Sequence, residues 1–141
     1  MKLSMILNVL LPVFVTADWT ITSLTYTRPT NAQGNLSNTV TFSVNIDGSN
    51  TQCNHTWSST EQNVNFVGTC SDSHTRFKLS GTSDGGGWVD VYRVADASAY
   101  NHGVAQVPVS SLSCSQNNGW IVCQSRGGIG MSTQREGGSI P

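Results

Sequence analysis

The fold is decided by a strictly alternating stretch, Val40-Thr41-Phe42-Ser43-Val44-Asn45-Ile46. Every second side chain is apolar, and each one between is small and polar. Because successive side chains of an extended chain point to opposite faces, this pattern predicts a β-strand with one face in a core and the other in solvent. Asp47-Gly48 follows directly and favours the tight turn of a β-hairpin. An antiparallel hairpin is therefore expected around residues 40–57.

Shorter alternating runs occupy much of the remaining chain. Trp19 and Ile21 share one face, and the alternation resumes at Leu24 and Tyr26 after a phase slip at residues 22–23, as a β-bulge would produce. Turn-forming residues 28–38 predict a loop. No segment has a sustained 3.6-residue period, and further strands are expected around residues 53–57, 64–70, 77–79, 88–94, 105–109 and 120–123. The pattern predicts an all-β fold, a compact antiparallel β-barrel or sandwich.

The N-terminus has the parts of a secretory signal peptide. Lys2 is basic, residues 6–15 are mostly apolar, and Val15-Thr16-Ala17 places small residues before a cleavage site. We therefore expect residues 1–17 to be a signal peptide and the protein to be secreted; the alternative is an N-terminal element buried in the fold. No later run approaches the roughly 20 apolar residues of a membrane helix, so no span is expected after processing.

The remaining residues, 18–141, suffice for a single β-barrel domain with one core. Its last part, residues 127–141, contains five glycines and a final proline. We expect this Gly-rich segment to add an edge strand around Ile129 and Met131 and to fray at its end.

All four cysteines, Cys53, Cys70, Cys114 and Cys123, follow the expected signal peptide. An even number in an oxidising compartment predicts two disulfides, with three connectivities to choose from. We favour Cys53–Cys70 and Cys114–Cys123, because each pair brackets a hairpin-like segment. A structural zinc site is the competing interpretation, but the chain has no CxxC and its histidines lack ligand spacing.

The formal net charge of −1 and the lack of a basic block give no electrostatic support for a nucleic-acid partner. Two sequons, Asn35-Leu36-Ser37 and Asn54-His55-Thr56, are candidate N-glycosylation sites in a secreted eukaryotic protein. Of the two we favour Asn35, because Asn54 adjoins a half-cystine.

No catalytic residues, metal ligands or cofactor site are expected from the sequence. Residues 81–85 match the GxSxG motif around Ser83, but the strand–helix context of a hydrolase is missing, so we interpret Ser83 as a turn residue. Among the scattered acidic residues, only Asp90 lies in a clearly alternating strand segment. We interpret it as a solvated aspartate on the face of that strand, not as one of the paired carboxylates of a glycosidase. A small secreted hydrolase using Asp90 or Ser83 stays open as a third functional hypothesis.

The candidate contact residues are Trp88, Tyr92 and Arg93. Alternation places Trp88, Asp90 and Tyr92 on one face and Val89, Val91 and Arg93 on the other. If the valines point inward, the aromatic residues form an exposed strip that suits a protein partner or a flat ligand. If the aromatic residues point inward they belong to the core, and the pattern favours this second placement.

The sequence resembles the family of the Alternaria major allergen. The similarity lies in Trp19-x-Ile21-x-x-Leu24 followed by Arg28-Pro29, the alternating Phe42-Val44-Ile46 strand, the two local cysteine pairs, and the ending Trp120-Ile121-Val122-Cys123-Gln124. The resemblance covers most of residues 18–141. It implies a secreted fungal β-barrel without a known catalytic centre, and it fits best the branch of elicitors that provoke a hypersensitive response in plants.

From the resemblance we expect a secreted fungal elicitor or effector that plants recognise and that triggers defence by binding rather than catalysis. The expected partner is a plant extracellular or cell-surface protein. The alternative is a carrier of a small ligand, either a small aromatic ligand such as a flavonoid, or a sugar. The family's allergen has an extra cysteine before its first strand that links subunits, and Asp18-Trp19 leaves no room for one here. No covalent dimer is therefore expected.

Overall fold

The computed structural model describes residues 19–61, 64–81 and 87–141. The expected signal peptide, residues 1–17, and Ser83 of the GxSxG match lie outside these described residues. Within them the chain is built from β-strands and one short 3₁₀ turn, Val109–Ser111. The strands are β1 Thr20–Pro29, β2 Ser37–Ile46, β3 Ser49–Ser58, β4 Phe66–Cys70, β5 Thr75–Gly81, β6 Gly87–Asp96, β7 Ala99–Val107, β8 Leu112–Asn117, β9 Trp120–Ser125, β10 Ile129–Gly130 and β11 Ser132–Gly137. None of the described segments is a helix long and apolar enough to cross a bilayer.

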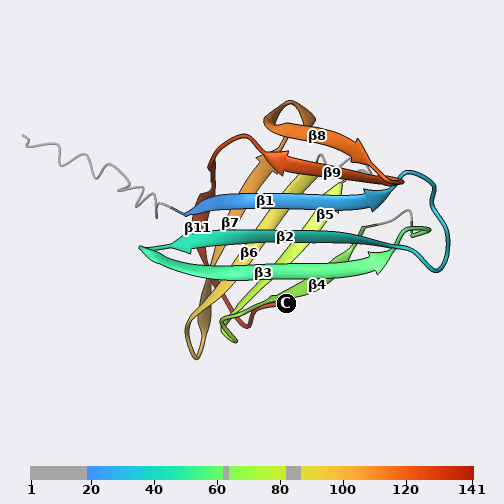
Figure 1. The fold of residues 1–141 in the computed structure, drawn as a ribbon. Coiled ribbons are helices and arrows are strands. Elements are labelled where there is room, and N and C mark those ends of the chain that lie inside the picture. Colours follow the sequence, from blue (N-terminus) through green and yellow to red (C-terminus); the bar gives the residue numbers. More distant parts are fainter. Residues whose placement is uncertain (1–18, 62–63, 82–86) are drawn as a thin grey trace, which may run out of the picture.

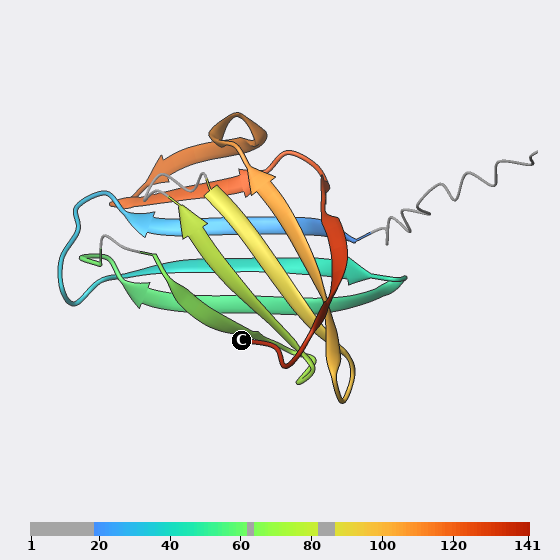
Figure 2. The same ribbon diagram turned by 180° about the vertical axis from the view of Figure 1, so that it is seen from behind.

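All the strand pairs are antiparallel and belong to one sheet, with the order β11-β7-β6-β5-β4-β3-β2-β1-β9-β8 and with β10 beside β1. The sheet curls, so that β1–β3 form one wall and β5–β7 cross it at a steep angle to form the other (Figures 1 and 2). The expected all-β fold is confirmed as a curled, half-barrel sheet.

The hairpin that the alternating stretch predicted joins β2 to β3. Ten register pairs run from Ser37↔Ser58 to Ile46↔Ser49. At its tip both Asp47 and Gly48 have positive φ, 51° and 89°, as a tight hairpin turn requires. The predicted bulge in β1 is also present, because its register against β2 shifts between Thr22 and Thr25.

The core fills the space between the two walls. Its largest fully buried side chains lie at inward-facing positions of both walls. Phe42 of β2 packs edge-to-face against Phe77 of β5, with ring centroids 4.9 Å apart. Packing is tight enough that Gly103 of β7 cannot carry a side chain without a clash. A Cβ at this position would lie 2.6 Å from Cε3 of the buried Trp19.

The C-terminal segment forms a strand at the expected position, near Ile129 and Met131, and a longer strand that was not expected. It forms β10 on β1 and then β11 on β7, and the buried Met131 lies between them with its N–H donating to the carbonyl of Trp19 at 3.0 Å. The six residues of β11 cover the otherwise free edge of β7 with backbone hydrogen bonds. This segment therefore links β1 to β7 at one end of the curled sheet. Fraying of the chain end stays a prediction.

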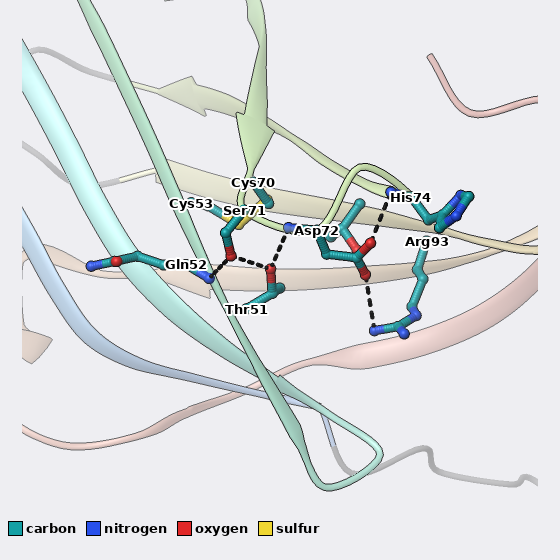
Figure 3. Close-up of a disulfide and its surroundings, with 9 residues drawn as sticks. Thr51, Gln52, Cys53, Cys70, Ser71, Asp72, His74 and Arg93 are labelled. Carbon is teal, nitrogen blue, oxygen red and sulfur yellow. Dashed lines mark hydrogen bonds and ion pairs between the residues drawn. A yellow bond between two sulfur atoms is a disulfide. The ribbon is translucent and has the colours of Figure 1, made fainter.

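Both favoured disulfides are confirmed. Cys53–Cys70 joins β3 to β4 and Cys114–Cys123 joins β8 to β9, each across a directly opposed register pair with Cα atoms 4.0 Å apart. Figure 3 shows the first disulfide, beside which Ser71 continues the pairing by accepting a hydrogen bond from the backbone N–H of Gln52 at 3.1 Å. The cross-links thus tie neighbouring strands on both sides of the β1–β2 region.

Candidate functional site

The structure places Trp88 on the outer face of the sheet. Val89 and Val91 are completely buried, whereas Trp88 is 47% exposed. The favoured inward placement of the aromatic residues is therefore wrong. The two valines fill the core of β6 instead, because the alternating face that contains them meets Phe77 and Ala105 of the core cluster.

Tyr92 lies on the same outer face as Trp88 but is only 7% exposed. Its ring stacks on the imidazole of His102 at 4.4 Å and lies 5.9 Å from the ring of Tyr100. Of the two aromatic residues of β6, only Trp88 is therefore exposed, in place of the two-residue strip that alternation allowed.

Arg93 does not join the other two predicted contact residues. It follows the inward alternation of Val89 and Val91, and its guanidinium lies 3.5 Å from the carboxylate of Asp72 (Figure 3). A hydrogen bond from the backbone N–H of His74 lowers the pKa of Asp72, and the hydroxyl of Thr75 and the charge of Arg93 act in the same direction. Arg93 therefore anchors the β4–β5 turn.

A cluster of polar side chains, which the sequence analysis did not predict, surrounds His102 on the outer face of β6, β7 and β11. Its Nε2 lies 2.7 Å from a carboxylate oxygen of Asp90, and its Nδ1 lies 2.8 Å from one of Glu136. The Tyr100 hydroxyl donates to Glu136 at 2.5 Å, and the Gln134 amide does so at 2.6 Å. Asp90, which we expected to be a solvated aspartate, is instead held by the imidazole.

The electrostatics of the His102 cluster follow from these contacts. The hydrogen bond from Tyr100 lowers the pKa of Glu136 to about 2, with further contributions from His102 and Gln134. Burial raises the pKa of Tyr92 to about 12, helped by the nearby carboxylate of Asp90. An imidazole held between two carboxylates suits the joining of strands. In the described residues, no group of three or more His, Cys, Asp or Glu side chains is arranged to hold a metal ion.

A second feature is a hollow of about 680 Å³ at the end of the sheet where β1 ends and β2 begins. The residues that line it include Tyr26, Arg28, Asn38, Glu61 and Gly81. We predicted a loop for residues 28–38, but β1 runs to Pro29 and β2 starts at Ser37. Because both strands extend further than expected, Arg28 and Asn38 lie on strands.

The two sequons are both accessible. Asn35 lies in the loop between β1 and β2, and Asn54 points outward from β3 beside the buried Cys53. Glycosylation of either asparagine stays a prediction.

These features define a disulfide-linked, curled β-sheet protein with an exposed tryptophan, Trp88, and a hollow at the end of the sheet where β1 ends and β2 begins. No family model and no curated protein matches the sequence. Two solved structures of the allergen Alt a 1 from Alternaria alternata are similar to it. The first has a TM-score of 0.61 at 12% identity over 85% of this chain and 89% of the allergen. The second has a TM-score of 0.59 at 13% identity, over 84% and 93% respectively. The chain therefore has an Alt a 1-like fold, as the sequence resemblance implied.

Proposed function

We propose that this protein is a secreted fungal elicitor, recognised at the plant cell surface or in the apoplast, that triggers defence by binding and not by turnover. The Alt a 1-like fold, the two disulfides and the secretory pattern of residues 1–17 support this proposal. The partner is a plant extracellular or cell-surface protein.

The observation that carries the proposal is the exposed indole of Trp88 on a rigid strand. Large aromatic rings are enriched among the residues that contribute most to protein interfaces, and a ring fixed on a sheet loses little freedom on binding. Trp88 pairs with Ser80 of β5 and Gln106 of β7, so polar side chains flank it on both sides. This arrangement suits a contact in which the indole enters a pocket of the partner.

The test is infiltration of leaves of several plant species with correctly oxidised protein. Wild type should cause cell death or ion leakage, and Trp88→Ala should cause a much weaker response. Val109→Ala is the comparison variant, because Val109 is also an exposed apolar residue, 52% exposed, but lies on the 3₁₀ turn that follows β7. Absence of a response to wild type in every host would refute the elicitor function.

The second candidate function is a carrier of a small ligand, and the hollow beside Tyr26 and Arg28 favours it. Its volume of about 680 Å³ falls within the range of roughly 300–1,000 Å³ that is typical of ligand sites. Titration with small aromatic molecules, followed by tryptophan fluorescence, tests this function. A flat titration for every ligand class would exclude it.

A further inference from the structure

We propose that the hollow between the ends of β1 and β2 binds a planar aromatic molecule with a single carboxylate, which pairs with Arg28 and Asn38. This inference rests on the second candidate function and specifies its ligand.

The register brings Arg28 and Asn38 together. Thr27 of β1 pairs with Thr39 of β2, so the next position along the ladder sets Arg28 beside Asn38. Asn38 in turn pairs with Trp57 of β3. Arg28, Asn38 and Trp57 therefore form one row across three strands, on the inner side of the curled sheet.

Asn38 is an unusual residue for this position. It is only 6% exposed and belongs to the alternating set that also contributes the core residues Val40 and Phe42. Asn38 also lines the hollow. Its side-chain amide therefore adds a polar group to a wall that is otherwise continuous with the core, where a ligand can form a hydrogen bond with it.

Arg28 supplies a positive charge next to this amide. It forms no ion pair with any described residue, its Nε is buried without a hydrogen-bond partner, and the residue lines the hollow. A guanidinium is always charged and offers paired N–H donors whose geometry matches a carboxylate. Arg28 and Asn38 together can thus donate to both oxygens of one carboxylate.

The remaining walls select the rest of the ligand. Tyr26 lines the hollow and stacks on Trp57 with centroids 5.9 Å apart, so its ring is held in place as a flat surface. Pro29 adds a further apolar surface. The exposed Glu61 also lines the hollow, and its carboxylate repels a second negative charge on the ligand. These walls favour a flat monoanion over a dianion.

The experiment uses 2-naphthoate as the probe, with neutral 2-naphthamide and the dianion 2,6-naphthalenedicarboxylate for comparison. Wild type should bind 2-naphthoate at least about tenfold more tightly than either, because a charge-assisted pair contributes on the order of one to two factors of ten. Arg28→Gln and Asn38→Leu should each weaken binding of 2-naphthoate by about tenfold or more. Arg126→Gln is the matched control, since Arg126 is exposed and lies outside the hollow.

Arg28→Lys, which keeps the charge but loses the paired donors, should bind with intermediate affinity. Because a variant can fail to fold, the wild-type protein supplies a second readout. In NMR spectra, 2-naphthoate should shift the indole N–H signal of Trp57 and leave that of Trp88 unchanged. The inference is overturned if 2-naphthamide binds as tightly as 2-naphthoate, or if the Trp57 signal does not move. Tight binding of the neutral probe would overturn the inference but leave the carrier function standing. Absence of binding by all three probes would also overturn the inference, and the carrier function would fall only if the titrations with the other ligand classes were flat as well.

Discussion

His102 of β7 and Glu136 of β11 face each other at 2.8 Å between Nδ1 and a carboxylate oxygen. The other ring nitrogen of His102 faces Asp90 of β6 at 2.7 Å. Both ring nitrogens of His102 thus lie within hydrogen-bond distance of a carboxylate. One side chain therefore joins the last strand to two central strands of the outer face, and the C-terminal segment is held by side chains as well as by its backbone ladder.

Glu136→Gln should make the protein less stable at neutral pH and change how its stability depends on acid. The folded-state pKa of Glu136 is about 2, below its ordinary value of 4.5. The carboxylate therefore stabilises the fold above about pH 4.5, and this contribution is lost as the pH falls towards 2. Unfolding by urea at several pH values should show the gap between wild type and variant narrowing over this interval. A constant gap would contradict the prediction.

Tyr92 should be the last tyrosine to ionise, because its pKa is raised to about 12. Burial and the carboxylate of Asp90 both disfavour the phenolate, so stability should fall as the pH rises above the ordinary value of 10.0. In a titration followed by phenolate absorbance, Tyr92→Phe should remove the most alkaline step. If that step persists in the variant, the environment described for Tyr92 is wrong.

Gly103→Ala should destabilise the protein by about 1–3 kcal/mol, the usual cost of overpacking a close-packed core. The added methyl group would press on the indole of Trp19, which is buried between β7 and the start of β1. Gly137→Ala is the matched control, because a Cβ at this position would have no neighbour within 4 Å. Chemical denaturation measures the stability of both variants. Equal unfolding midpoints for Gly103→Ala and Gly137→Ala would contradict the close packing of Gly103 against Trp19.

Removal of either disulfide should lower the free energy of unfolding by about 3 kcal/mol, as the chain-entropy model gives for loops of this length. The sequence separations are 17 for Cys53–Cys70 and 9 for Cys114–Cys123, so the first pair should contribute slightly more. Paired substitutions to alanine, compared by urea unfolding, test both values. A loss well under 1 kcal/mol for both pairs would show that the sheet does not depend on them.

The strands around the β2–β3 hairpin could be predicted because one face is apolar throughout, and the bulge in β1 could be predicted from its shift in phase. The cysteine pairing was also predictable, because both partners lie on neighbouring strands. In β6, however, Val89 and Val91 alternate with Trp88 and Tyr92, and both sets are apolar. Alternation alone could not decide which set faces the core.

The polar groupings were harder to predict, because they depend on strand pairing. The His102 cluster requires β11 to pair with β7, and nothing in the polar sequence of residues 132–137 indicates that partner. Arg28 and Asn38 lie together only because two strands extend into a segment rich in turn-forming residues. The alternation that resumes after the bulge in β1 places Arg28 on the inner face. It does not indicate that Asn38 of β2 lies beside it.

The most direct measurement of the central claim compares ion leakage from leaves infiltrated with equal amounts of oxidised wild type, Trp88→Ala and Val109→Ala. If the outer surface of the sheet is what plants recognise, wild type and Val109→Ala should give the same strong leakage and Trp88→Ala much less. Equal leakage from all three proteins, or none from wild type, would contradict this account.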